Sequence, residues 1–164
     1  MAILPKYPPM ECLARLRKWC AAQDRAHSDA RRKLHSWGYR GEEAEAMIAE
    51  LISENFLSEE RYAIHFAQGK YRLKRWGWHK IESALRQKGL SAHSILSARK
   101  AFDADYEDEA LLKLLLKKQR LISESDRQKR RAKLLRFGLS RGYTHEAVYK
   151  AVEEALKAES SQEP

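Results

Sequence analysis

The sequence predicts an all-α protein made of three tandem three-helix repeats that form an elongated, curved array. Helix breakers are rare, with seven Gly and four Pro in 164 residues, while Ala, Leu, Glu, Lys and Arg, which favour helices, are abundant. A short signature that ends a helix also occurs three times at nearly equal spacing. Such a period is typical of repeat proteins, in which each unit packs against its neighbour.

The repeated signature is a basic helical end followed by glycine and an apolar residue. It occurs as RRKLHSWGY at 31–39, SALRQKGL at 83–90 and LLRFGLSRGY at 134–143. Glycine directly after a helix adopts the left-handed conformation that closes it, and the apolar residue behind it packs on the last turn. The glycines are 51 and 53 residues apart, and they are Gly38, Gly89 and Gly142. We therefore expect repeats at 10–56, 58–102 and 105–157 and a disordered tail at 158–164.

The stretch RAHSDARRKLHSWGY, residues 25–39, contains the signature helix of the first repeat. Ser28 is its expected N-cap and Gly38 its stop. His27 and His35 are about two helical turns apart, too far to share one metal ion, which helices bind through residues four apart. We interpret the stretch as a capped amphipathic helix.

In each repeat one helix precedes the signature helix and another follows it. Preceding helices are expected near 10–22, 59–75 and 105–120. The following helices are marked by apolar residues at helical spacing, which are Ala44, Met47, Ile48, Leu51 and Ile52; Ile95, Ala98 and Phe102; and Val148, Ala151, Val152 and Leu156. Tyr62, Phe66 and Leu73 form the expected apolar face near 59–75, and Ser91 and Thr144 are expected N-caps.

Gly138 is a departure within the third signature, since the other two have Leu34 and Leu85 at this position. A glycine in the middle of a helix costs about 1 kcal/mol relative to alanine. Its presence indicates ordinary divergence, a bend, or a neighbour that approaches closely.

Motifs for catalysis, metals or membrane insertion are missing from the sequence. Neither G-x-x-x-x-G-K nor G-x-G-x-x-G occurs, and the six histidines are scattered without an H-E-x-x-H motif. Cys12 and Cys20 are too far apart for a C-x-x-C site and are expected to be reduced core residues. No apolar run approaches the length of a membrane span, and MAILPKYPPM lacks the apolar core of a signal peptide. We therefore expect a cytoplasmic protein with no enzymatic activity, cofactor or metal.

The charge predicts a polyanionic partner, because the net charge is +9 and the isoelectric point is near 9.6. Seven glutamates and no Lys or Arg lie between residues 41 and 60, whereas 61–90 carries a net +7 and 126–141 a net +6. Basic side chains of this kind neutralise phosphates. The candidate nucleic-acid or filament contacts are Lys70, Arg72, Lys74, Arg75, Lys80, Arg127, Lys129, Arg130, Arg131, Lys133 and Arg136. The alternative is a solvated basic surface without a partner.

Aromatic residues are interleaved with the first of these basic runs. KYRLKRWGWHKI, residues 70–81, contains Tyr71, Trp76 and Trp78. These rings either stack on exposed bases or belong to the core where two helices join, in which case only the charges face solvent. The second run, DRQKRRAKLLRF, has no aromatic residue before Phe137, which favours a helix that tracks phosphates and does not discriminate between bases.

A family resemblance covers residues 10–157. The segment FLSEERYAIHFAQGKYRLKRWGWHKIESALRQKGL, 56–90, resembles the central repeat of RecX, the bacterial regulator of the recombinase RecA. RAHSDARRKLHSWGY is similar to that family's first-repeat helix, and RFGLSRGYTHEAVYKAVEEAL to its last. In the middle segment the resemblance rests on an apolar–Leu–acidic helix start, the basic helix, Gly77, Lys80–Ile81, and Leu85 before Gly89. Gly138 departs from the bulky apolar residue usual in the family.

The resemblance implies a non-enzymatic modulator of RecA, mainly an inhibitor. It would bind in the helical groove of the RecA–DNA filament and so regulate recombination, DNA repair and the SOS response. The expected partners are the RecA filament and single-stranded and double-stranded DNA without sequence preference, and the protein is expected to be a monomer. The basic repeats alone would equally suit an autonomous helical, sequence-nonspecific DNA-binding protein.

Overall fold

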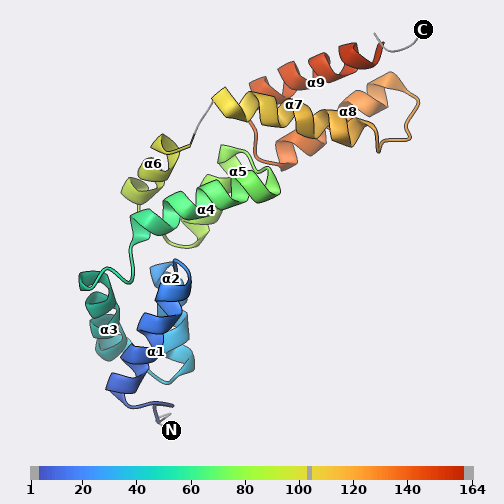
Figure 1. The fold of residues 1–164 in the computed structure, drawn as a ribbon. Helices are drawn as coiled ribbons and strands as arrows, with labels where there is room; N and C mark the ends of the chain where they lie inside the picture. Colours follow the sequence, from blue (N-terminus) through green and yellow to red (C-terminus); the bar gives the residue numbers. More distant parts are fainter. Residues whose placement is uncertain (1–3, 103–104, 161–164) are drawn as a thin grey trace. The chain divides into compact units, whose positions relative to one another are not determined.

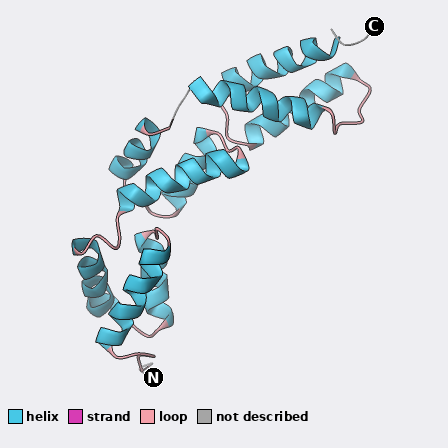
Figure 2. Ribbon diagram, in the orientation of Figure 1, coloured by secondary structure: helices cyan, strands magenta, loops and turns pink. Residues whose placement is uncertain are grey.

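The computed structural model describes residues 4–102 and 105–160, and its regular structure is entirely helical (Figures 1 and 2). Nine helices and no strand occur in this described part, which confirms the all-α prediction. The helices are α1 (Pro9–Ala22), α2 (His27–Ser36), α3 (Gly41–Ser53), α4 (Glu59–Lys74), α5 (Trp78–Gln87), α6 (Ala92–Lys100), α7 (Asp105–Gln119), α8 (Arg127–Ser140) and α9 (His145–Ser160).

Contacts divide the chain into two compact units, each of which is described by itself. Unit 1 contains residues 4–65 and 85–98, and unit 2 contains 66–84 together with 99–102 and 105–160. The division passes through the predicted middle repeat, and the three repeat boundaries stay a prediction. Helix α9 extends to Ser160, so residues 158–160 of the predicted tail are helical, and 161–164 lie outside the described residues.

The three signature glycines end their helices as predicted. Gly38, Gly89 and Gly142 have φ angles of +91°, +80° and +91°, in the left-handed region that glycine adopts without steric cost. The apolar residues behind them are buried, and they are Tyr39, Leu90 and Tyr143. The backbone N–H of Tyr39 donates to the carbonyl of Leu34 at 3.0 Å, which closes the last turn of α2.

Helices α1, α2 and α3 in unit 1 surround one apolar core. Cys12, Leu16 and Cys20 line the buried face of α1, and both cysteines are free thiols, as predicted. Burial raises the pKa of both thiols above the ordinary value. On α3 most of the predicted apolar face is buried, but Ile52 is 43% exposed.

The start of α2 differs from the prediction. Ala26 is the N-cap and makes no side-chain capping hydrogen bond, so the assignment of Ser28 as N-cap is wrong. The Ser28 hydroxyl instead donates to the carbonyl of Lys88 at 2.9 Å. Beside it, the Lys88 ammonium pairs with Asp29 at 2.8 Å. The Ser28 hydroxyl therefore bonds to a residue distant in the sequence and does not cap its own helix. Ser91 and Thr144 do accept N–H bonds from residues three ahead, as N-caps do.

Helices α7, α8 and α9 lie side by side in unit 2 (Figure 1). Their core is formed by Leu111 and Leu115 of α7, Leu134 of α8, and a face of α9 that includes Val148. A Cβ atom at Gly138 would lie 2.8 Å from Cγ1 of Val148. Of the explanations left open for Gly138, the structure therefore supports the close neighbour.

The turn between α4 and α5 packs directly against the turn between α8 and α9. The Gly77 N–H donates to the carbonyl of Arg141 at 2.7 Å, and the His79 N–H donates to that of Gly142 at 3.0 Å. A Cβ atom at Gly77 would lie only 2.5 Å from the carbonyl oxygen of Gly142. This close backbone contact fixes the end of α4, and with it the first basic run, within unit 2.

Candidate nucleic-acid interface

The first basic run lies at the C-terminal end of α4, where the chain turns sharply. Arg75 has a φ angle of +54°, unusual for a residue with a side chain. Its N–H donates to the carbonyl of Tyr71 at 3.0 Å, and its own carbonyl accepts from the Tyr143 hydroxyl at 3.1 Å. Burial raises the pKa of Tyr143 far above its ordinary value, so the hydroxyl stays protonated and able to donate. Both bonds hold the turn that presents the basic side chains.

Three cations of this run are exposed and unpaired. Among the described residues, no carboxylate lies within ion-pair distance of Arg72, Lys74 or Arg75. Cations in the last turn favour the negative end of the helix dipole, which is a structural reason for Arg72 and Lys74 to be there. That interaction leaves their charged groups in solvent and available to a phosphate.

The two tryptophans have different surroundings. Trp78 packs against Phe102 with ring centroids 5.6 Å apart, and its Nε1–H donates to Glu82 at 3.1 Å. Trp78 is therefore part of the packing of unit 2. Trp76 is partly buried, and the ammonium groups of Lys70 and Lys80 lie 5.0 and 4.8 Å from its ring centroid. It thus brings two of the predicted contact residues to one ring.

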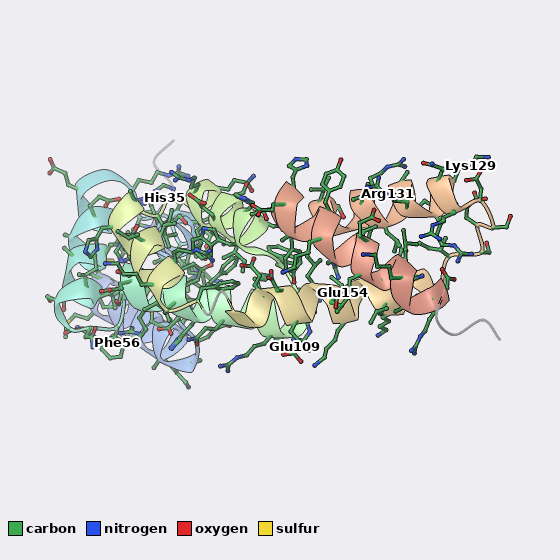
Figure 3. The ribbon with its side chains drawn as sticks, turned by 90° about the horizontal axis from the view of Figure 1, so that it is seen from above. His35, Phe56, Glu109, Lys129, Arg131 and Glu154 are labelled. Atoms are coloured by element: carbon green, nitrogen blue, oxygen red, sulfur yellow. The ribbon has the colours of Figure 1, made fainter. Side chains whose placement is uncertain are left out.

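The second basic run lies on α8, and the structure divides it into paired and unpaired cations. Arg130 pairs with Glu159, Arg131 pairs with Glu153 at 2.6 Å, and Lys133 lies 3.5 Å from Glu124. Arg130 and Arg131 therefore hold α8 against α9. Within this run on α8, the exposed cations that have no ion-pair partner among the described residues are Arg127, Lys129 and Arg136. Figure 3 shows Lys129 and Arg131 pointing toward the upper edge of unit 2.

Two features of this region were missed in the sequence. Leu73, expected on the apolar face of its helix, is 82% exposed between Arg72 and Lys74, so that expectation is wrong. In addition, Lys113 and Lys117 of α7 line a cleft together with Arg75. A basic i, i+4 pair on α7 was visible in the sequence, but nothing there indicated that the end of α4 lies beside it.

Other kinds of site find no support in the described part of the chain. It contains no group of three or more His, Cys, Asp or Glu side chains placed to hold a metal ion. None of its helices has both the length and the apolar character needed to cross a membrane.

Three-helix segments with glycine stops and a surface of unpaired cations define a basic helical-repeat protein. Two family models match the chain, one described as the second three-helix domain of RecX, at residues 58–98, and one as its third three-helix domain, at 105–152. Together they cover more than half of the chain, which belongs to the RecX family.

Curated relatives agree with this assignment, and each carries the name "Regulatory protein RecX". The protein of Clostridium botulinum strain Alaska E43 is 36% identical over 137 residues, which are 82% of this chain and 64% of the relative. That of Herbaspirillum seropedicae is 26% identical over 90% of this chain and 93% of its own. The chain thus spans less than two thirds of the length of the clostridial relative. These relatives are named as regulatory proteins and not as enzymes.

Solved structures share the fold. A crystal structure of a regulatory protein RecX matches with a TM-score of 0.80 and 23% identity, over 89% of this chain and 71% of that one. The structure of RecX from Lactobacillus salivarius matches with a TM-score of 0.78 and 16% identity, over 90% and 96%. At these identities the likeness concerns the fold alone.

Proposed function

We propose that this protein regulates the RecA recombinase, mainly as an inhibitor, by binding in the groove of the RecA–DNA filament. Membership of the RecX family, whose relatives are named regulatory proteins, supports a regulatory role. The observation that carries the proposal is the set of exposed cations at the end of α4 that have no ion-pair partner among the described residues, which are Arg72, Lys74 and Arg75.

Unpaired cations are better suited to bind phosphate than paired ones. When a lysine or arginine binds a DNA phosphate, counterions are released and binding is favoured. An arginine that already pairs with a carboxylate, such as Arg131 with Glu153, must give up that partner first. We therefore rank the α4 cations first, Arg127, Lys129 and Arg136 second, and the ion-paired residues of α8 last.

A second candidate function is binding to DNA without RecA. The same α4 cations and the partly buried ring of Trp76 favour it, because neither feature requires a recombinase to be present. The two functions differ in what they predict for filaments. A RecA regulator binds RecA–DNA filaments more tightly than bare single-stranded DNA and lowers their ATPase rate, whereas a plain DNA-binding protein prefers bare DNA.

The test compares two triple charge reversals. R72E/K74E/R75E removes the proposed contacts, and K6E/K18E/R40E changes the charge equally at exposed cations of unit 1. Inhibition of RecA ATPase on single-stranded DNA is measured against concentration, beside binding to bare DNA over a range of salt. We expect weaker inhibition by the first variant alone. The slope of log K against log salt should also fall by about 2 for three lost contacts.

The α8 cations are tested separately. R127E/K129E/R136E is preferred to reversals at Arg130 and Arg131, because those arginines hold α9 and their reversal would disturb the fold. Wild-type inhibition by all the variants would refute a contact through these cations. A wild-type protein that binds bare DNA but leaves RecA ATPase unchanged would favour the second function.

A further inference from the structure

A cleft of about 290 Å³ in unit 2 lies between the end of α4 and the side of α7. Among the described residues of its lining, three are cations and one is an anion. These described residues are Arg75, Glu109, Ala110, Lys113, Leu114 and Lys117. In the view of Figure 3, Glu109 points toward the lower edge of the unit, whereas Lys129 and Arg131 point toward the upper edge. The cleft is therefore separate from the basic run of α8.

The α7 wall of this cleft is one face of a helix. Glu109, Lys113 and Lys117 are four residues apart, so their side chains follow one another along this face. The Lys113 ammonium pairs with the Glu109 carboxylate at 2.5 Å. Among the described residues Lys117 has no ion-pair partner. Between the charged groups, Ala110 is 6% exposed and forms an apolar floor.

Arg75 supplies the opposite wall, and its backbone is held in place. A residue with a side chain is strained in a left-handed conformation, and such positions persist where the surrounding structure enforces them. The hydrogen bonds of Arg75 with Tyr71 and Tyr143 enforce it here. A guanidinium group on a fixed backbone loses less conformational entropy than one on a mobile backbone when it forms bidentate hydrogen bonds to an anion.

We propose that this cleft binds one phosphodiester of a nucleic-acid backbone through Arg75 and Lys117, with Lys113 exchanging Glu109 for the phosphate. The choice of this ligand depends on the proposed function, since DNA is the polyanion expected there. The inference extends that function by adding the two lysines of α7 to the DNA contact. Two cations without an ion-pair partner in the described part of the chain, over an apolar floor, suit a group that carries one negative charge beside the carbons of a sugar. Arg72 and Lys74, in the last turn of the same helix, offer contacts for further phosphates.

The decisive experiment uses two neighbouring lysines. K117E places an anion in the cleft, whereas K118E makes the same charge change on the next residue, whose ammonium lies over the ring of Phe137 at 5.1 Å, outside the cleft. Binding of the full chain to oligo(dT) is measured by fluorescence anisotropy at several salt concentrations. We expect K117E to weaken binding about fivefold at 0.1 M salt and to lower the salt slope by about 0.7, as for one lost phosphate. K118E should bind nearly as wild type.

Further variants and a competitor complete the test. E109Q should tighten binding, because it removes the carboxylate that competes for Lys113. K117Q should weaken binding less than K117E, and it replaces K117E if that variant fails to fold. Inorganic phosphate should compete with oligo(dT) no more than chloride does at equal ionic strength. Strong competition by phosphate would assign the cleft to a free anion and overturn the proposal.

The result also separates this inference from the proposed function. Equal affinities of K117E and K118E, with DNA binding otherwise retained and still sensitive to R72E/K74E/R75E, would overturn the cleft alone. If R72E/K74E/R75E loses RecA inhibition while K117E and K118E do not differ, the cleft proposal alone is likewise overturned. If the wild-type chain does not bind oligo(dT) at all, DNA contact by these residues is refuted in both proposals.

Discussion

Replacement of Gly77 by alanine tests the packing that fixes the end of α4. The added Cβ would lie 2.5 Å from the carbonyl oxygen of Gly142 and 2.6 Å from the backbone nitrogen of Tyr143. Both are backbone atoms, and a rotamer change cannot move them aside. The α4–α5 turn must therefore separate from the α8–α9 turn. This separation breaks the hydrogen bonds from the N–H groups of Gly77 and His79.

The expected cost follows from these contacts. Two lost backbone hydrogen bonds cost about 1 kcal/mol each, and forcing an extra methyl group into a packed site costs about 1–3 kcal/mol. The free energy of unfolding should fall by about 3–5 kcal/mol. At about 2–4 °C per kcal/mol for a chain of this length, the melting temperature of G77A falls by roughly 10 °C.

Gly69 provides the matched control within α4. Apart from the nearby backbone of α4 itself, no described atom lies within 4 Å of a Cβ built at Gly69, and its backbone is helical. Alanine should therefore stabilise the helix by up to about 1 kcal/mol. Thermal unfolding of G77A, G69A and wild type is followed by circular dichroism at 222 nm. A G77A melting curve that overlays wild type, or an equal loss in G69A, would refute the argument from close backbone packing.

Two further predictions concern the acidic residues of unit 1. Burial raises the pKa of Glu59, but hydrogen bonds from the Ser91 N–H, the Ser91 hydroxyl and the Ser94 hydroxyl outweigh it, so the pKa lies below the ordinary value. The resulting stability is present above the unfolded-state pKa, about 4.3, and is lost as pH falls through the lower folded pKa. E59Q should therefore lower the free energy of unfolding at pH 7 by about 1 kcal/mol, measured as a lower urea midpoint, and should reduce the loss of stability below pH 4. E42K/E43K, at two exposed positions, should leave DNA binding unchanged or tighter in the oligo(dT) assay, and weaker binding would contradict the assignment of the contact to unit 2.

The features that could be predicted from the sequence are those decided within a few residues. A glycine stop depends on the conformation of one residue and on the apolar neighbour behind it, so the ends of the signature helices were predictable. The caps at Ser91 and Thr144 are equally local. Apolar residues at helical spacing also predicted most of the buried faces, because a helix has one face toward the core.

Tertiary neighbours decide the remaining features. The Ser28 hydroxyl binds Lys88, sixty residues away, in place of its own helix. Leu73 matches the apolar spacing of α4 but is exposed at the end of the helix. The pairing of Arg131 with Glu153 depends on how α8 packs against α9. The sequence alone does not distinguish the paired cations of that run from the unpaired ones. The α7 side of the cleft was missed for the same reason.

Each signature turn has a second role, because an upstream segment binds to it. The carbonyl of the residue before each stop glycine accepts a hydrogen bond: Trp37 from the Lys6 N–H, Lys88 from the Ser28 hydroxyl and Arg141 from the Gly77 N–H. At two of the turns the approach is close: a side chain would be crowded at Gly38 and would have no room at Gly142. A Cβ at Gly38 would lie 3.1 Å from Cα of Pro5, and one at Gly142 would lie 2.4 Å from Cβ of Lys80.

The donors of two of these bonds belong to the start of the preceding signature helix, at Ser28 and Gly77. At the first turn, the segment around Lys6 makes the corresponding bond, from the Lys6 N–H to the carbonyl of Trp37. Tyr39, behind Gly38, donates its hydroxyl to the carbonyl of Tyr7 at 2.7 Å, as Tyr143 does to that of Arg75. The N-terminal segment therefore closes the first turn of unit 1 with the same two kinds of bond that fix the α4–α5 turn in unit 2.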